Sequence, residues 1–156
     1  MGKYDLTKII PQREPMIFLS DVEDFNYENQ TLISRVDVRD TDLMFDTTLN
    51  GIPSCASLEF MAQSIACCIG LSDLRNNPDA GPVIGFVLGS RKISVLNSVY
   101  LVNRSYFVHV KSMFCDNNMA SFDCQIFDED KNLMANGILN AFRPDNMKTF
   151  MENNNE

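Results

Sequence analysis

The sequence predicts an α+β fold in which an antiparallel sheet of about six strands wraps around one long central helix. Residues 54–72 read S-C-A-S-L-E-F-M-A-Q-S-I-A-C-C-I-G-L-S, and Glu59 is the only charged residue among them. A helix that is apolar on nearly all sides has to be buried. The second half of the chain consists of alternating apolar runs separated by turn residues, which is typical of antiparallel hairpins. We expect the sheet to cover most of the helix and a second subunit to cover the remainder.

The elements follow one another along a single expected domain. Residues 5–10 indicate a short helical turn, and the two prolines of 11–15 force an extended or turning path. The expected strands are residues 16–25, 31–38, 83–88, 93–101, 106–114, 119–127 and 133–142. Because the chain is polar and rich in asparagine from residue 145 onward, we expect one domain at 1–144 and a polar C-terminal tail at 145–156.

The central helix has boundary signals at both ends. Pro53 precedes it, and Ser54 is a good capping or first-turn residue. Gly70, Ser72 and Asp73 indicate its end.

One side of this helix carries polar groups. Helical spacing aligns Cys55, Glu59 and Gln63. Because an unpaired buried carboxylate is costly, Glu59 requires an explanation. Either the stripe faces a functional pocket, or Glu59 pairs with an arginine or lies at a subunit surface.

Composition and charge exclude several classes of function. The net charge of −8 argues against non-specific binding to nucleic acid or to an anionic membrane. The apolar segment is short and interrupted by polar residues, so we expect no membrane span. Five cysteines without C-x-x-C spacing and a single histidine predict no metal site, and no nucleotide-binding motif indicates a cofactor. Free cysteines and the absence of a signal-peptide pattern lead us to expect a cytoplasmic protein.

Two segments resemble a known enzyme family. Residues 9–22, I-I-P-Q-R-E-P-M-I-F-L-S-D-V, resemble the opening L-P-H-R-x-P-F-L-x-V-D-R-V of bacterial 3-hydroxyacyl-[acyl carrier protein] dehydratases, which have the hotdog fold. Residues 52–63, I-P-S-C-A-S-L-E-F-M-A-Q, resemble the start of their central helix, M-P-G-V-L-x-x-E-A-M-A-Q, with Glu59 at the catalytic glutamate. With G-F-V-L-G-S-R-K at 85–92, the chain looks closer still to a divergent branch from aryl polyene pigment clusters. The resemblance covers about residues 5–144.

The resemblance implies that the protein removes water from a 3-hydroxyacyl thioester in fatty acid or polyene biosynthesis. This chemistry needs backbone N–H groups at the helix start to stabilise an oxyanion, and the matching donor is the N–H of Ser54, with Cys55 next. Glu59, its pKa raised by a dry pocket, would deliver a proton to the departing hydroxyl. Gln63, one turn on, would hold Glu59 in place by a hydrogen bond.

The family's catalytic histidine, on the loop before the helix, is missing from this sequence. Counting back from Glu59 gives Phe45 at its position, and small gaps offer Asp46 or Thr48. Asp46 is the best replacement base on chemical grounds. The structural alternative is that Asp46 is a solvated or capping aspartate of the loop.

Other polar residues are weaker candidates. The one histidine, His109, is expected to point to solvent from the outer face of a strand. Gln12, in place of a histidine of the opening motif, is expected to be structural.

The resemblance also implies partners. The substrate would be a thioester of acyl carrier protein or coenzyme A. Because carrier proteins are acidic, docking requires a basic patch, which we expect at Arg91 and Lys92, with Arg104 and Arg143 as weaker candidates. Hotdog domains pair through their sheets and helices, so we expect a homodimer or a heterodimer with another hotdog subunit.

The missing histidine leaves three functions open. The first is a dehydratase that uses Glu59 with Asp46 or a water molecule. The second is a hotdog acyl thioesterase. The third is a catalytically weak subunit that binds an acyl chain and completes a heterodimer with an intact dehydratase. The motif match ranks the dehydratase first.

Overall fold

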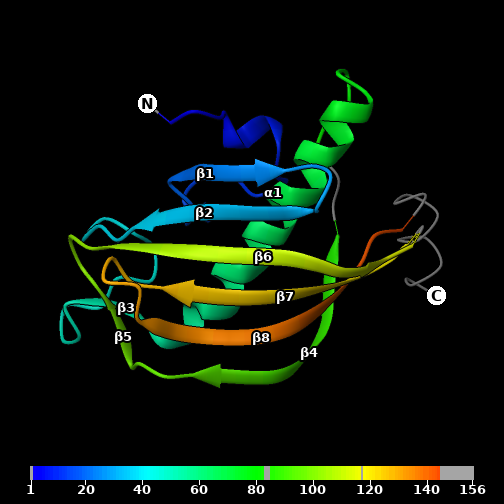
Figure 1. Ribbon diagram of the computed structural model, residues 1–156. Helices are drawn as coiled ribbons and strands as arrows, with labels where there is room; N and C mark the ends of the chain where they lie inside the picture. Colours follow the sequence, from blue (N-terminus) through cyan, green and yellow to red (C-terminus); the bar gives the residue numbers. More distant parts are fainter. Residues whose placement is uncertain (1, 83–84, 117, 145–156) are drawn as a thin grey trace, which may run out of the picture.

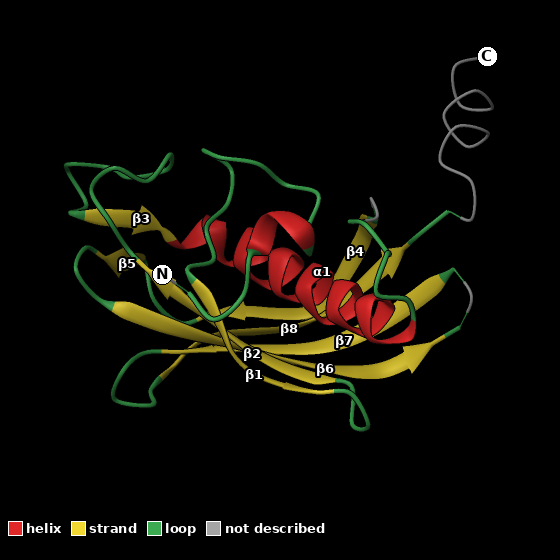
Figure 2. Ribbon diagram, turned by 90° about the horizontal axis from the view of Figure 1, so that it is seen from above, coloured by secondary structure: helices red, strands yellow, loops and turns green. Residues whose placement is uncertain are grey.

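A curved antiparallel sheet holds one long helix, α1 (Ser57–Asn76), against its concave face (Figures 1 and 2). The structure is a computed structural model that describes residues 2–82, 85–116 and 118–144. Within these residues the main sheet has six strands, in the order β1 (Asp21–Asn26), β2 (Thr31–Asp37), β6 (Ser105–Cys115), β7 (Met119–Phe127), β8 (Leu133–Phe142) and β4 (Phe86–Val95). The hotdog fold predicted from the sequence is confirmed.

Shorter elements lie around the two ends of the helix. A second sheet, formed by β3 (Gly51–Pro53) and β5 (Val99–Leu101), leads directly into a 3₁₀ turn, η2 (Ser54–Ala56), from which α1 continues. Figure 2 shows β3 and β5 at the start of α1, away from its C-terminal end. The expected helical turn near the N-terminus is present as η1 (Leu6–Lys8).

Alternating burial explains how the sheet fits the helix. In β2 every second residue is buried, as the predicted alternation requires. The inward residues of the sheet form one core with α1, and its largest members are Tyr100, Phe60, Phe122, Ile10, Leu32, Ile52 and Met61. By length and composition the segment Ser54–Asn76 is apolar enough to cross a membrane. Because its side chains pack on the sheet, it is instead the core helix of the domain.

The helix extends past the end predicted from Gly70 and Ser72. It continues to Asn76, and the backbone N–H of Asn77 donates to the Asp73 carbonyl. The Ser72 hydroxyl donates to the Cys68 carbonyl one turn back, so Ser72 is satisfied inside the helix. Gly70 is small for a packing reason, because a Cβ there would lie 2.4 Å from the carbonyl oxygen of Ile9.

The first expected strand is shorter than predicted. β1 begins at Asp21, and residues 16–20 belong to no strand. Ile17, Phe18 and Leu19 are buried nonetheless, and the N–H of Phe18 donates to the side chain of Gln63 on α1. The apolar run that resembled a strand is therefore a segment that is buried against the helix without joining the sheet.

The later strands agree better with the prediction. β7 and β8 have the predicted bounds. β4 joins parts of two expected strands, because the break falls at 96–98, before β5. Residues 83–84 of the expected strand 83–88 and the predicted tail at 145–156 lie outside the described residues.

Substituting Gly70 by alanine tests the contact between α1 and the N-terminal segment. Alanine favours helix over glycine in an open position, but here its Cβ would meet Ile9 O at 2.4 Å and Ile9 Cγ2 at 2.9 Å. We expect Gly70→Ala to lower the free energy of unfolding by about 1–3 kcal/mol, measured by urea denaturation. Gly81→Ala is the control, because no atom lies within 4 Å of a Cβ built there. Equal stability of both variants with the wild type would contradict this packing.

Candidate active site

Gln63 and Glu59 form a hydrogen-bonded pair on the first turns of α1. The Gln63 Nε2 donates to Glu59 Oε1 at 2.9 Å, as their spacing predicts, and to the carbonyl of Met16 at 2.7 Å. Its Oε1 accepts from the N–H of Phe18 at 3.0 Å. Gln63 is fully buried, so these three bonds fix its amide and aim it at the Glu59 carboxyl.

The Glu59 carboxyl is held by a hydrogen bond at the start of the central helix. It is half-buried and lies in the first turn of the helix. In the described part of the chain it forms no ion pair, so the structural alternative of an arginine partner does not hold there. Its carboxyl is positioned by the neutral amide of Gln63.

The start of the helix is anchored to the small sheet by hydrogen bonds. The N–H of Ser54 donates to the Ser98 carbonyl at 3.1 Å. The Ser57 hydroxyl donates to the Ser54 carbonyl at 2.6 Å and also bonds the Tyr100 hydroxyl. Tyr100 is fully buried, and burial raises its pKa to about 12, so it remains a neutral donor to Ser57.

These bonds change the expected assignment of the oxyanion donor. The N–H of Ser54, the first expected donor, is bonded to the Ser98 carbonyl, which favours the second expected donor, Cys55. The next amide along, that of Cys55, lies where helix geometry provides no intrahelical partner. Among the described residues, no acceptor outside the helix takes it, and the Cys55 side chain is exposed.

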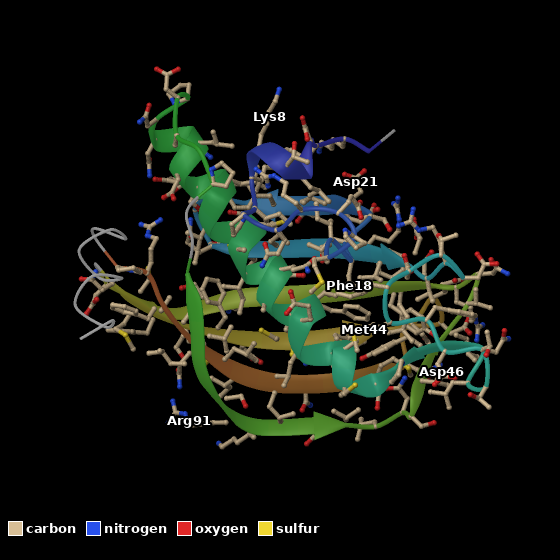
Figure 3. All side chains as sticks on the ribbon, turned by 180° about the vertical axis from the view of Figure 1, so that it is seen from behind. Lys8, Phe18, Asp21, Met44, Asp46 and Arg91 are labelled. Carbon is tan, nitrogen blue, oxygen red and sulfur yellow. The ribbon has the colours of Figure 1, made fainter. Side chains whose placement is uncertain are left out.

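Asp46 is committed to a turn. Its Oδ1 accepts from the N–H and hydroxyl of Thr48 and, at 3.3 Å, from the N–H of Leu49, while its backbone pairs with Gly51. The Thr48 hydroxyl and these backbone donors hold the pKa of the Asp46 carboxyl below its usual value. Figure 3 shows Asp46 on the loop that leads to β3. A stabilised carboxylate is a weaker base, which favours the structural alternative for Asp46.

His109 lies on the face of the sheet away from α1. Its neighbours in β6, Val108 and Val110, point into the core and are buried. The imidazole is half-buried against Phe127, with ring centroids 4.9 Å apart, and burial lowers its pKa. The sheet therefore separates His109 from Glu59.

The basic candidates fall into two groups. Arg91 and Lys92 are exposed at a bulge of β4, an edge strand, and neither has an ion-pair partner among the residues described (Figure 3). Arg104 lies 4.0 Å from Asp130 and Arg143 lies 2.6 Å from Asp73. The two weaker candidates are thus already paired.

A groove that sequence reasoning missed lies beside α1. It has a volume of about 120 Å³. Ala62, Ala66 and Gly70 line it from the helix. These three small residues recur at every fourth position, and that spacing is the sequence signal from which the groove could have been predicted. Gln12, expected to be only structural, lines the same groove, and its Oε1 is buried without a hydrogen-bond partner among the described residues.

Comparison with known proteins identifies what the chain is similar to. The family profile of the ApeP-like proteins, described as ApeP dehydratase, matches residues 4–152. A chain of the dehydratase heterocomplex ApeI:P from Xenorhabdus doucetiae is 19% identical, with a TM-score of 0.87, and the match covers 98% of this chain and 99% of that one.

More distant structures share the fold. A hypothetical thioesterase with coenzyme A from Streptococcus pneumoniae is 10% identical, with a TM-score of 0.60 over 79% of this chain and 84% of that one. The E. coli PaaI protein of the phenylacetic acid degradation operon is 8% identical, with a TM-score of 0.56 over 74% of each chain. No curated protein matches the sequence significantly.

Replacing Gln63 by leucine tests the buried amide. Leucine fills a similar volume in the core with an apolar side chain but leaves the N–H of Phe18, itself buried, without its acceptor. Each buried group left unpaired costs about 1–3 kcal/mol, so we expect at least that loss in the free energy of unfolding, measured by urea denaturation. Gln125→Leu, at an exposed position of β7, is the control and is expected to change stability by less than about 0.5 kcal/mol. Similar losses in the two variants would contradict the role of Gln63.

Proposed function

Because this chain belongs to the ApeP-like dehydratase family, we propose that Glu59 is the acid of an active site that removes water from a 3-hydroxyacyl thioester and is shared with a second hotdog subunit. The observation that carries the proposal is the Glu59 carboxyl itself. It is half-buried at the start of the central helix and is held by the amide of Gln63. A carboxyl positioned in this way can deliver a proton to a leaving group.

The reaction divides into two proton movements. A base takes the proton from C2 of the acyl chain, and the electrons of that bond form the C2–C3 double bond. The bond from C3 to oxygen breaks, and Glu59 gives its proton to the departing hydroxyl, which leaves as water. While C2 loses its proton, negative charge develops on the thioester oxygen, and the free N–H of Cys55 is the proposed donor to it.

The base is proposed to come from the partner. Within the described residues, Asp46 is held in its own turn and His109 lies across the sheet from Glu59. The dehydratases that the sequence resembles use a histidine on the loop before the helix, and hotdog active sites take residues from both subunits. A partner with that histidine would supply what this chain lacks. The name of the similar heterocomplex ApeI:P supports an assembly of two different subunits.

The edge strand β4 is the proposed site of subunit pairing. It has ten residues and, within the described part of the chain, only one sheet neighbour, β8. Val87, Leu88 and Val95 are between 43% and 58% exposed on it. Long apolar edges are normally covered, since their free N–H and C=O groups pair readily with another strand. The opposite edge strand, β1, has only six residues and exposes the carboxylates of Glu23 and Asp24.

The missing base also supports a second candidate function. In it, the chain only binds the acyl group and completes the partner's active site, without giving a proton. A third candidate, thioester hydrolysis, rests on the similarity to a thioesterase crystallised with coenzyme A. All three use a thioester of acyl carrier protein or coenzyme A, and all fit a cytoplasmic location, because the five cysteines are free thiols.

Replacing Glu59 by glutamine distinguishes these functions. The experiment uses the complex with a hotdog subunit encoded near this chain, and it follows the products formed from a 3-hydroxyacyl thioester. We expect Glu59→Gln to lower the rate of water loss by about 10²–10⁴-fold, because glutamine cannot donate the proton. Asp46→Asn is the matched control, and it should keep the rate because an asparagine oxygen can accept the same turn bonds.

Three results would contradict the proposal. An unchanged rate in Glu59→Gln would point to the acyl-binding subunit. Free acid as the product would point to the thioesterase. A loss confined to Asp46→Asn would restore Asp46 as the base.

Reversing the charges of Arg91 and Lys92 tests the basic patch. We propose that these two exposed residues attract an acidic carrier protein to a chain whose net charge is −8. The double variant Arg91→Glu, Lys92→Glu is expected to weaken binding of an acyl carrier protein at least tenfold at low salt, measured by titration calorimetry on the complex. Because both residues lie on β4, size-exclusion chromatography has to show that the complex is intact. Unchanged affinity would remove the patch from the proposal.

A further inference from the structure

The groove beside α1 begins next to the proposed acid. Its first helical residue, Ala62, lies one turn beyond Glu59, and its last, Asp73, lies near the end of the helix. The rise of an α-helix makes the distance between these two levels roughly 16 Å. The small side chains of Ala62 and Ala66 leave the helix surface low along this line, while Ile9 fills the space beside Gly70. The groove therefore runs along α1 from a point one helical turn beyond Glu59 to the level of Asp73.

An ion pair crosses the groove at the end away from Glu59. Arg143 Nη1 donates to Asp73 Oδ2 at 2.6 Å and so joins the helix to the segment that follows β8. The backbone of Arg143 is held as well, because its N–H donates to the Asn118 carbonyl at 2.8 Å and its carbonyl accepts from Asn118 Nδ2 at 2.9 Å. Both partners of the ion pair line the groove. The backbone from which the Arg143 side chain extends is thus fixed to the connection between β6 and β7.

We propose that the Asp73–Arg143 ion pair is the end wall of this groove and limits the length of the acyl tail that the protein accepts. This inference rests on the proposed binding of an acyl thioester at Glu59. The occupant is a straight apolar tail, because the groove follows the helix from one turn beyond the acid and its lining includes Ile65, Ile69 and Val87.

The physical reason for a limit is the change of lining along the groove. Each methylene placed between the apolar walls leaves water and strengthens binding roughly fourfold. A methylene that reaches Asp73 and Arg143 meets two charged groups that are bonded to each other and remain partly exposed to water. Such a methylene either remains in water or displaces water from the two charged groups, and in both cases it adds no affinity.

The test is a chain-length series. Affinities of straight-chain acyl-pantetheine thioesters, each longer than the last by two methylenes, are measured by titration calorimetry on the full chain in its complex. For the wild type we expect affinity to rise with tail length and then to level or fall. We call the length at which the rise stops the break. In the double variant Asp73→Ala, Arg143→Ala, the wall is removed while the backbone bonds with Asn118 stay. Its break is expected at longer tails, with at least tenfold tighter binding of the first thioester beyond the wild-type limit.

Two further variants control this result. Ala66→Leu places a larger side chain halfway along the groove and is expected to move the break to shorter tails. Arg75→Ala removes a cation two residues from Asp73, one that lies 3.8 Å from Glu28 and stacks over Tyr27, and should leave the break unchanged. A break at the same length in all variants, or affinity independent of tail length in the wild type, would overturn the inference.

Binding and turnover separate this inference from the proposed function. Glu59→Gln, which removes the proposed acid, is expected to keep the wild-type dependence of binding on tail length. If that variant kept its turnover while the wall variants still moved the break, the proposed role of Glu59 would be wrong and the proposed role of the groove would hold. If turnover were lost but no variant moved the break, the proposed role of the groove would be wrong and that of Glu59 would hold.

Discussion

The buried amide of Gln63 is the interaction on which the site depends. It connects α1 to the segment at 16–18 and to the carboxyl of Glu59 through three hydrogen bonds. The segment at 16–18 has no strand partner for these backbone groups, so the amide takes the place of a sheet ladder there. Because one group performs both tasks, the packing of the N-terminal segment and the orientation of the proposed acid are determined together.

The rest of the fold leaves one side of this arrangement uncovered. The sheet buries one face of α1, while Leu58 is 45% exposed and Ala62, Ala66 and Ile69 are half-buried on another. β4 ends the sheet on the groove side, with Val87 exposed. An apolar helix face and an apolar sheet edge side by side are surfaces that a second hotdog subunit would cover. A subunit placed there would also cover the groove. In a shared active site, a loop of that subunit would have to reach Glu59.

The sequence predicts features that depend on local, repeating patterns, but it does not predict individual contacts between residues far apart in the chain. The alternation of β7 and β8 and the spacing of Glu59 and Gln63 are local properties, and the structure confirms them. Gly70, which suggested the end of α1, lies inside the helix and is small because Ile9 approaches it closely, a contact that no local pattern reports. The pairing of Arg143 with Asp73 likewise joins residues seventy positions apart.

Two site residues show why composition alone does not assign chemistry. An aspartate before a buried helix can be a base or a turn residue, and the hydrogen-bond donors around Asp46 favour the turn. A serine at the helix start offers a free N–H unless another backbone carbonyl accepts it, as that of Ser98, just before β5, accepts the N–H of Ser54. In both cases the deciding partner lies outside the motif or depends on the backbone conformation around it.

The most direct test of the shared active site is a crystal structure of this chain with its hotdog partner and a non-hydrolysable 3-hydroxyacyl thioester analogue. Our account predicts that the Glu59 carboxyl lies within hydrogen-bond reach of the 3-hydroxyl and that a histidine of the partner faces C2. It also predicts that the two chains pair along β4. An analogue bound by two residues of the partner alone, with Glu59 out of reach, would contradict the account.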